Sequence, residues 1–171
     1  LSPELVLQAY PLGLFPWHQD QHYFYWFSPN PRMVLFPEKL KVSKSMRNVL
    51  NQNKFRITEN QAFDEVMLKC ETVKRSQDGE TWITDAFKST YSELHKKGVA
   101  KSIEAWNNQQ ELVGGLYGIE IGKVFFGESM FSSESICFSD STSDRAFNLT
   151  LLSWDFSDSK TSRDTSKGDS F

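Results

Sequence analysis

"LVGGLYGIEIGKVFFGESMF", residues 112–131, is the stretch that decides the fold of this chain. Its two apolar segments flank Gly122, a pattern typical of antiparallel β-strands joined by a tight turn. One carboxylate, Glu128, interrupts the second segment. Because an isolated buried carboxylate costs much free energy, such a group is usually paired, hydrogen-bonded or chemically active.

The segments before this stretch predict a sheet covered by helices. "AKSIEAW" (residues 100–106) is a third strand candidate, so we expect an antiparallel meander. Two helical patterns precede it, the first beginning near Asn60 and the second running from the cap Thr84 to Gly98. The residues expected to face inward are Phe63, Val66, Met67 and Cys70 in the first helix and Phe87, Tyr91 and Leu94 in the second.

The N-terminal part of the chain predicts short elements. Ser2 and Pro3 begin a short helix, as an N-cap followed by proline at the first helical position. The next stretch, up to Pro37, is dense in aromatic residues and prolines, so we expect turns and short strands there. Ser43 caps a further helix, and a short strand follows at residues 55–58. Together these patterns predict the α+β fold class.

Composition excludes several classes of protein. The 171 residues include 19 basic and 22 acidic side chains, and the net charge of -3 does not indicate a nucleic-acid binder for the chain as a whole. The two cysteines, Cys70 and Cys137, are too few for a disulfide framework and lack metal-ligand spacing. We therefore expect no metal site and a reducing, cytoplasmic environment. No long uncharged apolar run or signal-peptide pattern occurs, so no membrane partner is expected.

Five motifs occur in a fixed order: "SPELVLQAYPLGLFPW", "YWFSPNPRMVLFPE", "TWIT", "SIEAW" and "ELVGGLYGIEIGKVFFGESMFS". Together they resemble the leucyl/phenylalanyl-tRNA–protein transferases over residues 1–133. The resemblance implies a small N-terminal α/β domain (1–58), truncated at its start, then an incomplete acetyltransferase-like (GNAT) antiparallel-sheet domain (59–133), and a divergent Ser/Asp-rich tail (134–171). It also implies an enzyme that moves Leu or Phe, and less readily Met, from aminoacyl-tRNA to the N-terminal Lys or Arg of a protein, marking that protein for degradation. No metal or nucleotide cofactor is implied.

The chemistry of this reaction suits Glu128. An aminoacyl ester is already activated, so its aminolysis needs a neutral amine, correct positioning and a stabilised oxyanion. An α-amino group has a pKa of about 7.7 to 8, so a nearby carboxylate is a sufficient proton acceptor or relay. Glu128 is the candidate catalytic residue, or it binds the amino group of the donor amino acid. The alternative is a structural glutamate bonded to strand backbone.

The resemblance assigns four residues to the substrate site. Leu116, Phe125 and Gly127 match family residues that line the Leu or Phe pocket, and Ser129 is assigned to the same site. The alternative for Leu116 and Phe125 is ordinary sheet core. The adjacent pair Gly114 and Gly115 ("GG") indicates a bulge or a close approach, either by a ligand or by a neighbouring part of the chain.

RNA recognition is assigned to tryptophans and to a basic segment. Trp17 and Trp82 match family tryptophans at the site of the terminal adenosine, where aromatic stacking is the usual means of recognition. Lys41, Lys44 and Arg47 belong to a basic run that is expected to contact tRNA phosphates. The alternative is a solvated basic surface.

The tail departs from the family pattern. Family members continue after "GESMFS" with an apolar helix and a strand that ends in an Asp-x-Gln motif. A gapless extension places Asp158 at the catalytic Asp and Lys160 where Gln is expected. A reading-frame change near residue 133 and a diverged paralogue are the two explanations we consider.

Three functions are compatible with these patterns. The first is the aminoacyltransferase acting as a monomer on aminoacyl-tRNA and acceptor proteins. The second is a non-catalytic RNA-binding remnant of the same fold. The third is a related GNAT-fold acyltransferase that uses aminoacyl-tRNA on another amine.

Overall fold

A computed structural model describes residues 1–19, 23–72, 83–133 and 150–152. Its helices are α1 (Pro3–Ala9), α2 (Lys44–Asn51), α3 (Phe63–Thr72) and α4 (Asp85–Lys96), with short 3-10 turns η1 (Tyr10–Leu12) and η2 (Pro37–Lys39). Its strands are β1 (Phe15–Gln19), β2 (Phe24–Phe27), β3 (Arg56–Glu59), β4 (Ala100–Trp106), β5 (Leu112–Ile121), β6 (Val124–Ser132) and β7 (Thr150–Leu152).

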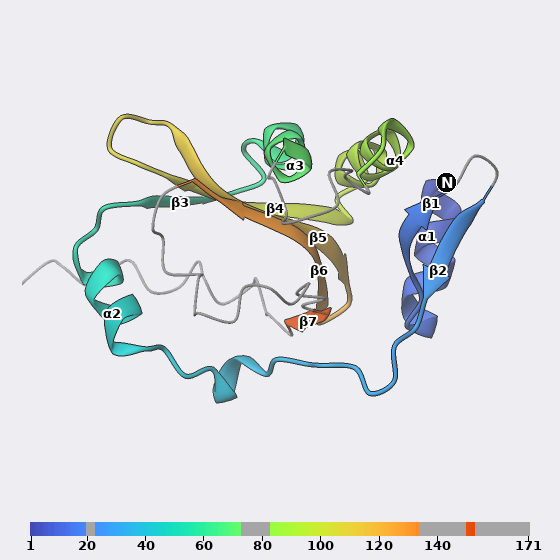
Figure 1. The fold of residues 1–171 in the computed structure, drawn as a ribbon, viewed down its shortest axis with the longest axis horizontal. Coiled ribbons are helices and arrows are strands. Elements are labelled where there is room, and N and C mark those ends of the chain that lie inside the picture. The colour runs from blue at the N-terminus through green and yellow to red at the C-terminus, as the bar shows by residue number, and fades with distance from the viewer. Residues whose placement is uncertain (20–22, 73–82, 134–149, 153–171) are drawn as a thin grey trace, which may run out of the picture.

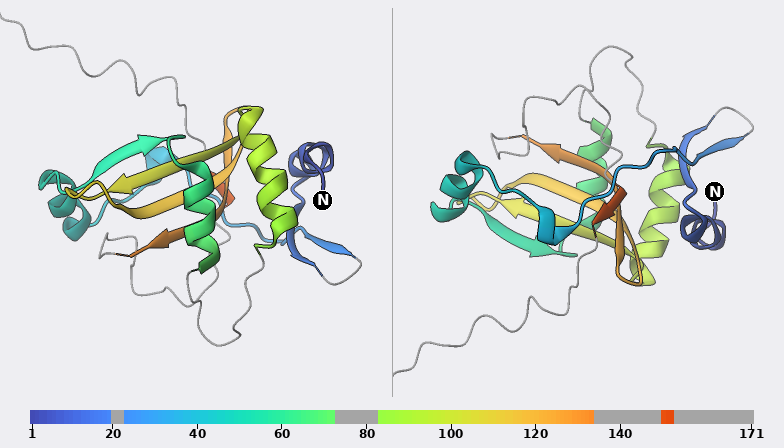
Figure 2. Two further views of the ribbon diagram at one scale, coloured as in Figure 1. Left: turned by 90° about the horizontal axis from the view of Figure 1, so that it is seen from above. Right: turned by 90° about the horizontal axis from the view of Figure 1, so that it is seen from below.

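The main sheet has five antiparallel strands in the order β3-β4-β5-β6-β7. The turn between β5 and β6 contains Gly122 at a φ of 61°, a left-handed conformation that glycine adopts without steric cost. Helices α3 and α4 lie side by side over one face of this sheet (Figures 1 and 2). The predicted meander and the α+β class are confirmed.

A separate hairpin of β1 and β2 lies beyond α4, next to α1 (Figure 1). From the hairpin the chain runs along the side of the sheet opposite to α3 and α4, and it reaches α2 at the far end of the molecule (Figures 1 and 2). The basic segment and the aromatic hairpin therefore lie at opposite ends of the sheet.

Local signals in the sequence account for the helix ends. The Ser2 side chain accepts a hydrogen bond from the Leu5 N–H (3.3 Å), and the Ser43 side chain accepts one from the Met46 N–H (3.1 Å). Gly98 follows the end of α4 at a φ of 76°. The predicted N-caps Ser2 and Ser43 and the glycine stop are confirmed, and Thr84 also stands at the N-cap position of α4.

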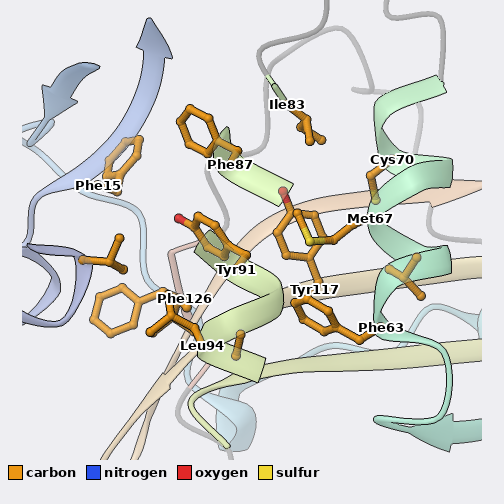
Figure 3. Close-up of a cluster of buried hydrophobic side chains, with 14 of the residues drawn as sticks. Phe15, Phe63, Met67, Cys70, Ile83, Phe87, Tyr91, Leu94, Tyr117 and Phe126 are labelled. Atoms are coloured by element: carbon orange, nitrogen blue, oxygen red, sulfur yellow. The ribbon is translucent and has the colours of Figure 1, made fainter. Parts of the chain in front are cut away.

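The core lies between the sheet and α3 and α4 (Figure 3). All seven helix residues that the sequence analysis turns inward are buried: Phe63, Val66, Met67, Cys70, Phe87, Tyr91 and Leu94. A Cβ at Gly115 would lie 2.7 Å from the Phe131 ring and 2.9 Å from Val66. Val66 of α3 and Phe131 of β6 therefore make the close approach predicted for the glycine pair, at Gly115, and no ligand is needed to explain it.

Helix α2 contributes no residue to the core. None of its residues is buried, and Leu50 is 56% exposed. The GNAT assignment and the division into domains remain predictions. Within the described residues, no helix has both the length and the apolar character needed to cross a membrane.

Candidate active site

Glu128 lies at an irregularity of the sheet. Tyr117 of β5 pairs with Ser129, and the next residue, Gly118, pairs with Gly127, so Glu128 is an extra residue of β6 with no partner in the register. Such a β-bulge disrupts the ladder locally and changes the direction of a side chain. The glutamate therefore leaves the regular alternation of its strand at the point where the sheet meets α1 and α4.

Two tyrosines connect Glu128 to the helices. The Tyr10 hydroxyl donates a hydrogen bond of 2.5 Å to Glu128 Oε1, and a 2.7 Å hydrogen bond joins the Tyr10 and Tyr91 hydroxyls. Because a phenol has one proton and Tyr10 gives its proton to the carboxylate, Tyr91 donates to Tyr10. Burial and the negative charge of Glu128 raise the pKa of Tyr10 well above its ordinary value, so Tyr10 stays a donor.

Arg32 supplies positive charge beside this pair. It donates from Nη1 to the Gly13 carbonyl (2.5 Å), and its guanidinium carbon lies 4.9 Å from the centre of the Phe15 ring and 5.9 Å from that of Phe126. These contacts hold the guanidinium between the hairpin and β6. Its charge favours the ionised form of Glu128.

The carboxyl group of Glu128 titrates near neutral pH. Burial raises the pKa of Glu128 from 4.5 to about 7, although the hydrogen bond from Tyr10 and the charge of Arg32 both oppose this rise. A carboxyl with a pKa near the operating pH can both accept and release a proton during a reaction. Glu128 is also partly exposed, so a substrate can reach the carboxyl group that titrates near neutral pH.

The predicted pocket residues lie on the other face of the sheet. Gly115 faces α3, so Leu116 faces the opposite side by strand alternation. A Cβ at Gly118 would lie 2.5 Å from Phe125 Cζ, so the Phe125 ring covers Gly118 on that same side. Leu116 and Phe125 are thus brought together, with Leu116 partly exposed and Phe125 buried.

Gly127 and Ser129 flank the bulge between these two regions. Gly127 is partly exposed, and Ser129 is buried. β7 pairs with Phe125 and Phe126 only, so within the described part of the chain residues 127–132 have no strand partner on their outer edge. A ligand at this edge can reach both the Glu128 side and the Leu116 side of the sheet.

The residues predicted to bind RNA are distributed over the molecule. Trp17 of β1 is partly buried, and its ring centre lies 5.2 Å from that of Phe27. Lys41, Lys44 and Arg47 are exposed and lie at the far end of the sheet, so they are not brought together with Trp17. Trp82 and Asp158 lie outside the described residues, and their roles remain predictions.

The sequence analysis missed Tyr10, Tyr91 and Arg32 as site residues. Tyr10 and Arg32 lie in two of the family motifs, and Tyr91 is among the predicted core residues. No sequence spacing links these residues to Glu128, because Tyr10 and Glu128 are 118 positions apart. In the described residues, no group of three or more His, Cys, Asp and Glu side chains is placed to hold a metal ion.

Fold and site together define an α+β protein in which one carboxylate, hydrogen-bonded to Tyr10 and influenced by the charge of Arg32, lies at a bulge of the main sheet. The chain belongs to the leucyl/phenylalanyl-tRNA protein transferase family, which its residues 34–147 match, while residues 1–30 match the N-terminal domain of that family.

Several curated relatives named leucyl/phenylalanyl-tRNA–protein transferase resemble 79% of this chain. The protein of Christiangramia forsetii is 51% identical over 137 residues, that of Flavobacterium johnsoniae 49% over 135, and that of Syntrophobacter fumaroxidans 47% over 135. The matched part covers 64%, 63% and 57% of these relatives, so the chain spans about three fifths of their length.

Proposed function

We propose that this chain transfers Leu or Phe, and less readily Met, from aminoacyl-tRNA to the N-terminal Lys or Arg of acceptor proteins, which marks them for degradation. Membership of the family supports the reaction class. The observation that carries the proposal is the titratable Glu128 at the β6 bulge, bonded to Tyr10 and placed on a stretch of β6 that has no strand partner on its outer side within the described residues.

In the proposed reaction the acceptor amine attacks the carbonyl carbon of the aminoacyl ester. A C–N bond forms, the ester C–O bond breaks, and the ribose oxygen of tRNA is the leaving group. Ionised Glu128 accepts the proton that the amine loses, and this proton passes to the leaving oxygen. The hydrogen-bonded tyrosines support the charge changes of Glu128 without losing their own protons.

The donor amino acid would lie at the edge of β6. Its side chain would contact Leu116 and Phe125 on one face, while the ester would lie near Gly127 and Ser129 and within reach of Glu128. An apolar cavity distinguishes side chains that differ by a methylene by only about 1 to 3 kcal/mol, which agrees with relaxed choice among Leu, Phe and Met.

The tRNA would make two separate contacts in this proposal. Trp17 and Trp82 would stack on the terminal adenosine, and Lys41, Lys44 and Arg47 would contact phosphates of the RNA body at the far end of the sheet. Asp158 would complete the catalytic group if the tail provides the family's Asp-x-Gln strand. We further propose that the protein acts as a monomer in the cytoplasm and without a cofactor.

Transfer from charged tRNA tests the proposal. Leu-tRNA and a peptide with N-terminal Arg should yield a Leu-Arg peptide, whereas the same peptide with an acetylated N-terminus should yield none. Binding of Leu-tRNA without product would instead support a non-catalytic RNA-binding protein. Product formed only with another amine would support a related acyltransferase with a different acceptor.

A further inference from the structure

One face of the β1–β2 hairpin carries a row of aromatic rings. Phe15 pairs directly with Phe27, so the two side chains share a face, and Tyr25 lies on the same face two residues from Phe27. The Trp17 ring joins them in an edge-to-face contact with Phe27 at 5.2 Å. We call Trp17, Tyr25 and Phe27 the aromatic face.

Exposure of the β2 rings increases toward the hairpin turn. Phe27 is 38% and Tyr25 44% exposed, whereas Phe15, which pairs with Phe27, is 5% exposed. Tyr23, still nearer to the turn, is 68% exposed. Large exposed aromatic side chains in a contiguous row are unusual on a monomer and indicate a binding surface.

The other face of the hairpin attaches it to the body of the protein. The Phe24 ring lies 5.7 Å from that of Phe87 on α4 in an edge-to-face contact, and Trp26 is partly buried against the main core. The hairpin can therefore hold Tyr25 and Phe27 in place without covering them.

The inner end of the row adjoins the candidate active site. Arg32 lies over the Phe15 ring at 4.9 Å and over Phe126 at 5.9 Å. Phe126 in turn contacts Tyr10, the hydrogen-bond donor to Glu128, with ring centres 5.1 Å apart. A chain molecule that leaves the site past Arg32 and Phe15 would next meet Phe27 and Trp17, and then Tyr25.

We propose that Phe27 and Tyr25 stack on the unpaired nucleotides that precede the terminal adenosine of an RNA bound at this site. The proposal rests on the proposed function, since it continues from the adenosine contact assigned to Trp17. Flat exposed rings suit nucleic-acid bases because every base has a π-face, and such stacking tolerates any base sequence. Residues 15–27 contain one acidic side chain, Asp20, and the described strands 15–19 and 23–27 contain none.

The experiment uses short unacylated single-stranded RNAs ending in adenosine. We compare the affinity of a tetranucleotide with that of adenosine alone for the whole chain, by quenching of tryptophan fluorescence. Tyr25→Ala and Phe27→Ala should each lower the affinity for the tetranucleotide by about 10-fold or more. Tyr25→Ala should leave the affinity for adenosine unchanged; this control applies to Tyr25 alone, because Phe27 packs against Trp17. Tyr25→Phe and Phe27→Trp should keep the wild-type affinity, because both retain a ring.

Ile57→Ala is the matched control, since Ile57 is 58% exposed on β3 at a distance from the hairpin. Unchanged tetranucleotide affinity in both alanine variants would overturn the proposal, and so would a wild-type chain that binds the tetranucleotide no better than adenosine. If the chain does not transfer Leu but its binding of the tetranucleotide still depends on the two rings, the proposed function is overturned. The proposed stacking of Tyr25 and Phe27 on RNA then still holds.

Discussion

Glu104 and Glu128 are two glutamates in neighbouring parts of one sheet with opposite surroundings. Glu104 is fully buried and accepts hydrogen bonds from Ser102 Oγ (2.6 Å), Thr58 Oγ1 (2.5 Å) and the Ala62 N–H (3.4 Å). Glu128 is partly exposed and accepts a hydrogen bond of 2.5 Å from the Tyr10 hydroxyl.

In the proposed function, the difference between them separates a structural carboxylate from a reactive one. The donors to Glu104 come from β3, β4 and the start of α3, so this side chain joins three elements. The surroundings of Glu128 provide fewer donors, and burial therefore raises its pKa to about 7. A carboxylate whose pKa lies near neutral pH is a better proton acceptor at that pH than a carboxylate with an ordinary pKa.

Glu104→Ala should have the largest effect, and this effect should be on stability. It leaves the hydroxyls of Thr58 and Ser102 and the N–H of Ala62 without this acceptor, and we expect the free energy of unfolding to fall by about 3 to 5 kcal/mol. Urea denaturation followed by circular dichroism measures this loss. Glu59→Ala, which removes an exposed carboxylate on β3, is the control and should have little effect. Equal losses in both variants would refute the structural role of Glu104.

Glu128→Gln should have the second largest effect, and this effect should be on chemistry. The amide retains the shape of the side chain but accepts no proton, so Leu transfer should fall by about 10²-fold with the fold intact. Single-turnover transfer from Leu-tRNA measures it, first in a chain with a family-like C-terminal strand restored. Unaltered turnover per folded molecule would mean that Glu128 is structural, like Glu104.

Tyr10→Phe should shift the pH dependence of transfer. The hydrogen bond from Tyr10 lowers the pKa of Glu128, so its loss should raise that pKa and move the lower limb of the rate–pH profile upward by about one unit. Tyr91→Phe is the control, because Tyr91 contacts Tyr10 and not the carboxylate, and its shift should be smaller. A profile that is the same in Tyr10→Phe and wild type would exclude Glu128 as the titrating group.

The smallest expected effect is on the pH dependence of the free energy of unfolding. Between pH 4.5 and about 7 the folded chain keeps a proton on Glu128 that the unfolded chain has lost. The free energy of unfolding should therefore decrease as pH rises through this window, by about 1 kcal/mol after allowance for partial exposure. The decrease should be absent in Glu128→Gln, and denaturation series at pH 5 and pH 8 would reveal it. An identical pH dependence in both proteins would contradict the raised pKa.

Several features of this protein could be predicted from the sequence because they depend on neighbouring residues. The Ser2 and Ser43 caps, the inward faces of α3 and α4 and the turn at Gly122 all follow from spacings of a few positions. The sequence also predicts helix α2, but not that all of its residues stay unburied, because a helical period does not indicate what covers the helix.

The sequence indicates a role for Glu128, but the tertiary structure determines the surroundings of its carboxylate. Sequence alone placed a carboxylate in an apolar strand, and family motifs made it a catalytic candidate. Only the folded chain placed Tyr10 and Arg32 beside Glu128, put the bulge at this residue and set Leu116 and Phe125 on the opposite face. The physical reason is that hydrogen bonding, charge and burial act through space, so groups more than a hundred positions apart determine one pKa without leaving a pattern in the sequence.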